Sequence, residues 1–203
     1  MYLDLDLLEQ TKKDGKTRIR IWEPKEPCIV LGRSNIAKKE ISLSLCIKDG
    51  ISVQRRAGGG GAVYIDKGVV IITITKTVNN NYDNEKYFKK INSIICKSLE
   101  KKGIENICQN GISDVCIDDK KLMGSSMYRS ESLLFYQGSI LQDVDISKIE
   151  KYLKHPSKEP DYRKKRSHKD FLITLRKAGY NISTEDLIEH LRRNINDNIR
   201  SIN

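Results

Sequence analysis

The chain has 203 residues, of which 38% are hydrophobic and 32% are charged, a composition that fits one globular domain with its own core. No apolar run approaches the roughly 18 residues of a membrane span, and the acidic start at residues 1–6 is unlike a signal peptide, so we expect a cytoplasmic protein without membrane partners. The net charge of +10 indicates an acidic partner.

The cysteines and the densest basic run narrow the class of protein and the kind of partner further. The cysteines are odd in number and include no CxxC pair, which predicts reduced, mostly packed thiols: Cys28, Cys46, Cys96, Cys108 and Cys116. The densest basic run, residues 163–166, lies near two prolines, with only Tyr162 and His168 available for stacking. We expect a solvated loop there and no nucleic-acid partner.

The first half of the chain alternates between short helical and strand patterns. Leu3, Leu7 and Leu8 recur at helical spacing before Gly15, and residues 38–49 fit a short helix, although an alternating strand template also fits them. Apolar or alternating runs predict strands at 18–22, 28–31, 51–53, 62–65 and 69–75. We expect the last two to form a hairpin that turns at residues 66–68.

The second half adds the clearest helix and more strands. An apolar helical face runs from Tyr87 to Leu99 and ends at Gly103. Strands are expected at 104–108, 115–117 and 133–141, and a final helix, capped by Ser183 or Thr184, carries Leu187, Leu191 and Ile195 on one stripe. Strands joined by short turns and helices in separate blocks predict an α+β fold with a mixed, largely antiparallel sheet flanked by helices.

Residues 55–64 contain two arginines followed by four consecutive glycines and an apolar run. Bare glycine backbone lets a ligand lie directly on main-chain N–H groups, and Arg55 and Arg56 add fixed positive charge. A carboxylate or phosphate is the ligand that this pattern favours. A glycine-rich hairpin turn is the alternative.

A second segment, residues 111–126, places two lysines after a predicted turn at Asp118 and Asp119. In an extended strand, successive side chains point to opposite faces, so Lys120 and Lys121 cannot both enter one pocket. A lysine facing the glycine loop would hold a carbonyl or phosphoryl oxygen as negative charge develops. A solvated hairpin lysine is the alternative.

Taken in order, these segments resemble the lipoate-protein ligases, which share a fold with octanoyl- and lipoyl-transferases and, more distantly, with biotin-protein ligases. Residues 55–68 resemble the pattern Arg-Arg-x-Ser-Gly-Gly-Gly-Ala-Val-(Phe/Tyr)-His-Asp-x-Gly. Residues 111–126 resemble Gly-Arg-Asn-Asp-(Leu/Ile)-Val-Val-Asp-Gly-(Arg/Lys)-Lys-Ile-Ser-Gly-Ser-Ala. Residues 28–33 and 136–141 match a strand ending in Gly-Arg and the pattern x-His-Gly-(Ser/Thr)-Leu-Leu.

The resemblance implies an enzyme that activates lipoate with ATP as lipoyl-AMP and transfers the lipoyl group to a lysine of an acceptor lipoyl domain. Lys121 falls on the family's motif lysine, which contacts the acyl carbonyl and phosphate oxygens, and Arg56 falls on the arginine near the acyl-phosphate. Asp114 and Ser113 fall near the nucleotide, where Mg²⁺ is implied through Asp114. The other residues implied to bind lipoyl-AMP are Arg33, Arg55, Gly58, Gly59, Gly60, Gly61, Ala62, Val63, Gly124 and Gly138.

Acidic acceptor domains of 2-oxoacid dehydrogenases or the glycine cleavage H protein are the implied partners. Residues 1–155 are expected to form the catalytic domain and residues 156–203 a loop and helix packed on it, without a full accessory domain, so a separate accessory chain is a further expected partner. The chain departs from the family pattern at Gly58, Ile65, Val69, Ser113 and Gln137. Two alternatives remain: an ATP-independent octanoyl or lipoyl transferase, and a non-catalytic accessory subunit that binds lipoyl domains.

Overall fold

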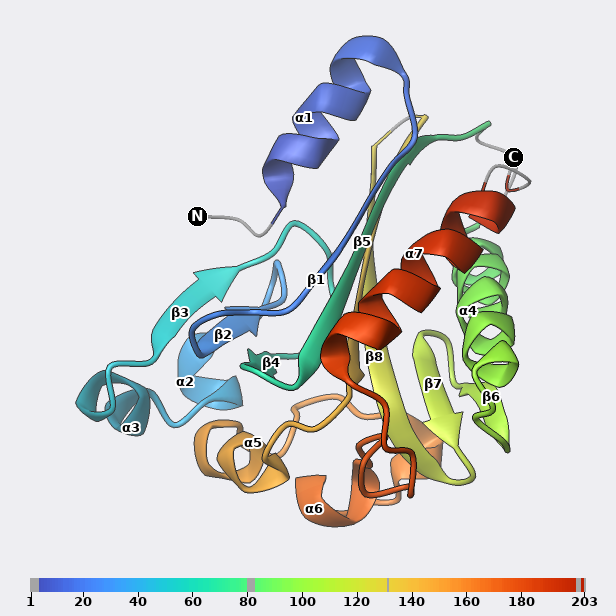
Figure 1. Ribbon diagram of the computed structural model, residues 1–203. Helices are drawn as coiled ribbons and strands as arrows, with labels where there is room; N and C mark the ends of the chain where they lie inside the picture. The colour runs from blue at the N-terminus through green and yellow to red at the C-terminus, as the bar shows by residue number, and fades with distance from the viewer. Residues whose placement is uncertain (1–3, 80–82, 131, 200–201, 203) are drawn as a thin grey trace.

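The main sheet has six antiparallel strands in the order β1-β5-β9-β8-β7-β6, seen in a computed structural model that describes residues 4–79, 83–130, 132–199 and 202 (Figure 1). Its strands are β1 (Arg18–Trp22), β5 (Val69–Thr77), β9 (Leu133–Leu141), β8 (Lys120–Ser130), β7 (Asp114–Ile117) and β6 (Ile107–Asn110). A second sheet orders β3 (Ser52–Arg55), β2 (Cys28–Leu31) and β4 (Val63–Ile65), with β2 parallel to β3 and antiparallel to β4. The predicted α+β class with a mixed, largely antiparallel arrangement is confirmed.

The predicted hairpin between residues 62–65 and 69–75 is wrong. Strand β4 pairs with β2, whereas β5 pairs with β1 and β9, so the turn at Asp66–Gly68 carries the chain from one sheet to the other. Both strands are largely buried. Each pairs with strands that are distant in the sequence, and the two do not pair with each other across the turn. The strand predicted at 104–108 begins later, at Ile107.

Two helices cover one face of the large sheet. Helix α4 (Asn84–Lys101) and helix α7 (Thr184–Ile199) pack against each other and bury apolar side chains in a cluster with Val70, Ile72 and Ile74 of β5. The long helix ending before Gly103 is confirmed, and Ser183 caps α7 through its hydroxyl, which accepts a hydrogen bond from the main-chain N–H of Asp186. The apolar stripe of α7 is therefore part of the core.

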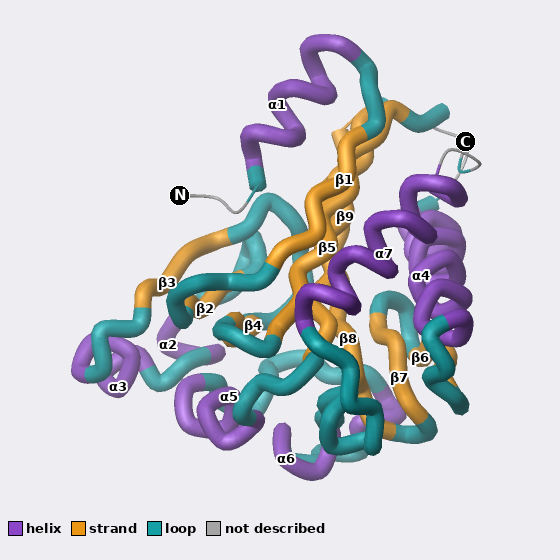
Figure 2. Tube along the Cα trace, viewed as in Figure 1, coloured by secondary structure: helices purple, strands orange, loops and turns teal. Residues whose placement is uncertain are grey.

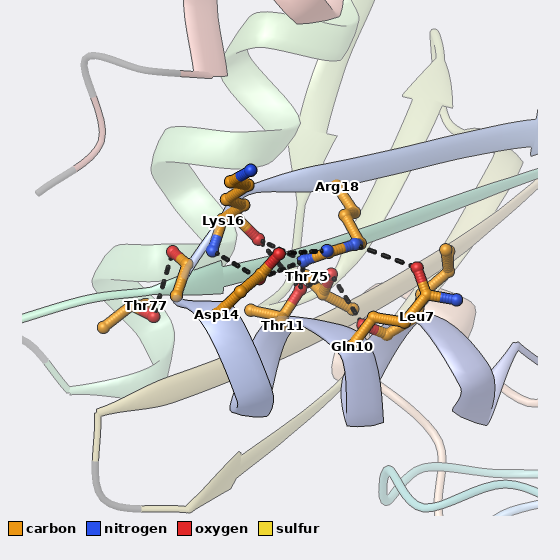
Figure 3. A network of polar contacts seen from close by, with 9 residues as sticks. Leu7, Gln10, Thr11, Asp14, Lys16, Arg18, Thr75 and Thr77 are labelled. Carbon is orange, nitrogen blue, oxygen red and sulfur yellow. Dashed lines mark hydrogen bonds and ion pairs between the residues drawn. The ribbon is translucent and has the colours of Figure 1, made fainter.

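Helix α1 (Leu5–Asp14) ends before Gly15, as predicted. It lies on the face of the sheet opposite α4 and α7 (Figure 1). Polar contacts fasten it to the strands (Figure 3): the hydroxyls of Thr11 and Thr75 lie 2.7 Å apart, and Arg18 pairs with Asp14. At its start, Asp4 accepts a hydrogen bond from the hydroxyl of Thr73. This face of the sheet is consequently polar along β5 and is bounded by α1 at one end.

The region predicted as one short helix at residues 38–49 forms α2 (Ala37–Glu40) and α3 (Leu43–Lys48). Between β9 and α7 the chain follows a long, largely irregular course interrupted by α5 (Ile146–Tyr152), the 3-10 turn η1 (Asp161–Arg163) and α6 (His168–Phe171), as Figure 2 shows. None of the helices in the described part of the chain has the length and apolarity that crossing a bilayer requires.

The basic run at residues 163–166 is only in part the solvated loop that we expected: Lys164 and Lys165 are exposed, but the two arginines fold inward. Arg163 is buried with its guanidinium 4.7 Å from the ring centroid of Phe171, and Arg166 lies over the same ring and pairs with Asp119 at 2.6 Å. Stacking on an aromatic ring and an ion pair explain why these side chains fold inward. All five cysteines are free thiols, and of these only Cys108 is exposed, so the prediction of packed thiols is confirmed for the other four.

Candidate active site

The register of the large sheet places polar side chains in two adjacent rows on the face opposite α4. In one row, Asp114 of β7 pairs with Gly124 of β8, which pairs with Ser139 of β9. In the next row, Ser126 pairs with Gln137, which in turn pairs with Thr73. Since residues two apart on a strand share a face, these rows form one polar surface.

Lys121 reaches this surface through a break in strand register. The pairing of β7 with β8 shifts between Val115 and Cys116, so that Lys121 and Gly124 both point to the polar face. Its Nζ lies 2.8 Å from Oδ1 of Asp114, and a Cβ added to Gly124 would come 2.8 Å from the same Nζ. The missing side chain at Gly124 therefore makes room for the lysine, whereas Lys120 is exposed.

The second oxygen of Asp114 is bound from the C-terminal part of the chain. The hydroxyl of Tyr162 donates to Oδ2 of Asp114 at 2.7 Å and accepts a weaker bond from the thiol of Cys116 at 3.5 Å. Burial, followed by the nearby Asp114 carboxylate, raises the pKa of Tyr162 well above its usual value, so the phenol keeps its proton and remains a donor. Lys121, Asp114 and Tyr162 thus form a hydrogen-bonded triad.

Tyr162 was missed as a site residue by sequence reasoning, which considered it only for stacking beside the basic run. No local pattern identifies it, because 48 residues separate it from Asp114. The C-terminal segment is held against β8 by a main-chain bond from Ile173 to the carbonyl of Lys121 at 3.0 Å. Residues 156–203 therefore contribute both a site residue and the core helix α7.

Arg56 organises the glycine loop from within. Its guanidinium is buried and donates to the carbonyls of Gly59 and Gly61, at 2.7 Å each from Nη2, and to the carbonyl of Val30. Burial lowers the pKa of Arg56 to about 10, which leaves it charged at neutral pH. The contact of Arg56 with a phosphate stays a prediction, since most of its donors are bonded to main-chain oxygens.

Arg55 has a similar role on the other side of the loop. Its Nη1 donates to the carbonyls of Gly32, Arg33 and Asn35, at distances of 2.7–3.0 Å. Gly32 is required sterically, because an added Cβ would lie 2.1 Å from the carbonyl oxygen of Gly60. Gly60 itself has φ +90°, a conformation that side chains other than glycine rarely adopt. Both arginines therefore shape the loop, and the backbone of residues 59–61 is left exposed.

Of the remaining predicted residues, Gly58, Ala62, Val63 and Ser113 lie around the glycine loop and the polar face, whereas Gly138 does not. Gly58 contacts β8 at Ser126 and Met127, so the loop borders the polar face, and its carbonyl accepts from the main-chain N–H of Arg33 at 2.9 Å. Ala62 and Val63 are half-buried and pack against the cluster around the smaller sheet, while the main-chain carbonyl of Ser113 accepts from Ser125. Gly138 lies on the other face, where a Cβ would meet Met123 and Tyr136 at 3.2 Å.

Asp114 is the residue to test for direct metal binding. Both of its oxygens are engaged, Oδ1 by Lys121 and Oδ2 by Tyr162. Within the described ranges, no three His, Cys, Asp or Glu side chains are grouped to hold an ion. Magnesium prefers several oxygen ligands, so this arrangement does not fit a protein-held Mg²⁺. The described residues do fit an anionic ligand, since the ammonium of Lys121 and the exposed loop backbone border one face.

Comparison with known proteins identifies the fold family. The family described as Lipoyl protein ligase A/B catalytic domain matches residues 1–196. Lipoate-protein ligase LplJ of Bacillus subtilis (strain 168) is 27% identical over 191 residues, covering 90% of this chain and 54% of that protein. Lipoate-protein ligase A of Blochmanniella floridana is 32% identical over 178 residues, covering 86% of this chain and 50% of its own length. The chain thus spans about half the length of these curated relatives.

Solved structures agree on the fold. A bi-partite lipoate protein ligase from Thermoplasma acidophilum, studied with its E2 lipoyl domain, superposes with a TM-score of 0.80 at 22% identity, covering 92% of this chain and 72% of that one. A crystal structure of lipoate-protein ligase A bound with ATP gives a TM-score of 0.72 at 22% identity, with coverage of 92% and 74%. Together with the match over residues 1–196, these likenesses show that the chain belongs to the lipoyl protein ligase A/B catalytic domain family.

Proposed function

We propose that this chain is a lipoate-protein ligase. In the first half-reaction, the carboxylate of lipoate attacks the α-phosphorus of ATP, and lipoyl-AMP forms as pyrophosphate leaves. In the second, the ε-amine of an acceptor lysine attacks the lipoyl carbonyl carbon, and an amide forms as AMP leaves and the amine loses a proton. The observation that carries the proposal is the ammonium of Lys121, held over Gly124 on the face that the glycine loop borders. Relatives named as lipoate-protein ligases support it.

Lys121 suits the first half-reaction. The first brings a carboxylate to a phosphate, so two negative charges approach each other, and the ammonium of Lys121 offsets their repulsion. In the structure its counter-charge is Asp114, at 2.8 Å. Ligand oxygens would take the place of Asp114 as partners of the lysine, while the bond from Tyr162 keeps the aspartate in position.

The second half-reaction needs no protein nucleophile, because an acyl-adenylate is already activated and requires a polarised carbonyl, an aligned amine and exclusion of water. The cysteines agree with this. Cys116 is the thiol nearest the triad, but it is 0% exposed, and burial raises its pKa to about 11, so it stays protonated at neutral pH. An ATP-independent transferase with an acyl intermediate on Cys116 is therefore disfavoured. Cys108 is exposed on the edge strand β6, where it pairs with Cys116, and a labelled acyl group trapped on its thiol would favour that alternative.

We propose acidic lipoyl domains, of 2-oxoacid dehydrogenases or the glycine cleavage H protein, as acceptors. The net charge of +10 would attract such domains at low ionic strength and raise the rate of encounter. We further propose that a separate accessory chain completes the enzyme, and the bi-partite lipoate protein ligase from Thermoplasma acidophilum supports this arrangement. Magnesium would arrive bound to the phosphates of ATP, in keeping with the engaged oxygens of Asp114. The cytoplasmic location stays a prediction.

The test is the mass of an acceptor lipoyl domain after incubation with the protein, ATP, Mg²⁺ and lipoate. The assay is run with and without an added accessory domain from a bi-partite ligase. We expect a gain of one lipoyl group that depends on ATP, and a fall of about 100-fold or more in Lys121→Ala. Lys120→Ala is the matched control, since it removes the neighbouring exposed lysine. Modification without ATP, or equal activity of the two variants, would refute the proposal.

A further inference from the structure

Ser126 adds a hydroxyl to the polar face that the sequence patterns did not select and the triad does not use, and unlike the hydroxyls of Ser139 and Thr73 it has no partner among the described residues. It lies on β8 two residues beyond Gly124, about 6.6 Å along the strand and on the same face. The residue is only 7% exposed, and among the described residues no side chain or main-chain group forms a hydrogen bond with its hydroxyl. A polar group so buried is normally paired, because an unpaired one loses its bonds to water.

The glycine loop rests directly on this hydroxyl. A Cβ added to Gly58 would lie 3.1 Å from Oγ and 3.2 Å from Cβ of Ser126. The backbone of Gly58 has no positive φ, so glycine is needed there for space and not for conformation. Ser126 thus occupies the volume that a side chain at position 58 would fill. In the family pattern matched by the two segments, the residue types are reversed, with serine in the loop and alanine on the strand.

We propose that Ser126 binds the ligand of this site, donating a hydrogen bond to an anionic oxygen of the acyl-adenylate or its precursors. This inference rests on the proposed function. The hydroxyl of Ser126 lies beside the space that a side chain at position 58 would fill, so it can make the polar contact that a serine at position 58 would make. The bond completes a row of donors along the face, from Lys121 over Gly124 to Ser126.

A purely structural hydroxyl would look different. Ser98 of α4 provides the comparison, since its hydroxyl is also unpaired but is sealed inside the core, with the residue 1% exposed. The hydroxyl of Ser126 is not among the sealed, unpaired atoms, and it borders Gly58, the residue that precedes the exposed backbone of residues 59–61. A ligand lying along the loop would therefore be within its reach.

The experiment compares Ser126→Ala, Gly58→Ser, the double variant and Ser98→Ala as the matched control. Binding of ATP and of lipoate is measured separately by calorimetry, and KM and kcat for lipoylation are measured with the accessory domain present. Ser126→Ala should lower the affinity for one of the two ligands, ATP or lipoate, about tenfold. ATP as the affected ligand assigns the bond to a phosphate oxygen, and lipoate assigns it to the carboxylate. Ser98→Ala should leave both affinities unchanged.

The double variant separates a ligand contact from a packing effect. Gly58→Ser alone should lower the melting temperature, because its Cβ meets Ser126, and should lower it less when residue 126 is alanine. The double variant should recover most of the lost ligand affinity, since its hydroxyl returns to the same place from the loop.

If wild-type protein binds ligand while Ser126→Ala binds equally well, or if the double variant recovers nothing, the inference is overturned. A wild-type protein that binds neither ligand would overturn it together with the proposed function, whereas binding without lipoylation would count only against the latter.

Discussion

Tyr162→Phe removes one hydroxyl from the Lys121–Asp114–Tyr162 triad and leaves the ring in place against Phe171, 5.2 Å away between centroids. The lost bond joins a phenol to a carboxylate at 2.7 Å, and the side chain of Asp114 is 9% exposed, so water replaces it poorly. Bonds to charged groups contribute about 1.5–3 kcal/mol, and Asp114 keeps Lys121, so we expect a loss of about 2 kcal/mol. For a chain of this size that corresponds to about 4–8 °C in melting temperature.

The chain contains a matched control for this substitution. The hydroxyl of Tyr152 donates to Oδ2 of Asp49 at 2.9 Å, and Lys151 pairs with the same carboxylate at 2.6 Å, which repeats the tyrosine–aspartate–lysine arrangement away from the site. The side chain of Asp49 is 26% exposed, so water can replace the lost donor there. Tyr152→Phe should therefore cost about 0.5–1 kcal/mol.

Activity distinguishes the two triads more sharply than stability. Without the hydroxyl of Tyr162, Lys121 is the one side chain of the described residues that still pairs with Asp114, and the tighter ion pair competes with the ligand for the ammonium. We expect kcat/KM for lipoylation to fall about tenfold in Tyr162→Phe and to stay unchanged in Tyr152→Phe. Thermal unfolding and lipoylation kinetics on both variants provide the measurement. Equal losses in the two variants, or full activity in Tyr162→Phe, would refute the positioning role.

Two further outcomes follow from the geometry. In Gly124→Ala the new methyl group displaces the flexible end of Lys121, so kcat/KM should fall by up to about 100-fold while the melting temperature changes little, and a variant with full activity would contradict the assigned path of the lysine. Burial, followed by the charge of Arg163, lowers the pKa of His168 to about 4, with Glu150 at 3.4 Å and His155 also facing the ring. The unfolded histidine binds a proton at a higher pH than the folded one, so the free energy of unfolding should fall as pH drops from about 6.5 towards 4, by up to about 1.4 kcal/mol per pH unit. Urea unfolding at pH 7, 6 and 5 should show this slope in the wild-type protein and not in His168→Gln.

Local patterns were sufficient for features whose cause is local. The helix ending before Gly103 follows from one apolar stripe, and the two lysines after the turn at Asp118 separate because strand side chains alternate. The glycine loop was recognised because consecutive glycines are costly unless bare backbone is used. These features needed no information about which segments meet in space.

The misses share a non-local cause. Strand β4 left its sequence neighbour for β2, and periodicity carries no information on which strand a run will pair with. Tyr162 reaches Asp114 across 48 residues, and Arg163 turns inward because Phe171 offers a ring to stack on.

Strand β5 belongs to both hydrophobic clusters of the molecule at once. Val70, Ile72 and Ile74 face the cluster under α4, while Val69 and Ile71 face the one around the smaller sheet. A strand shared in this way couples the stabilities of the two clusters. If one cluster unfolds and β5 leaves the sheet, the side chains that β5 contributes to the other cluster are exposed as well. The glycine loop belongs to the smaller sheet and Lys121 to the larger one, so this coupling holds the two halves of the site in one cooperative unit.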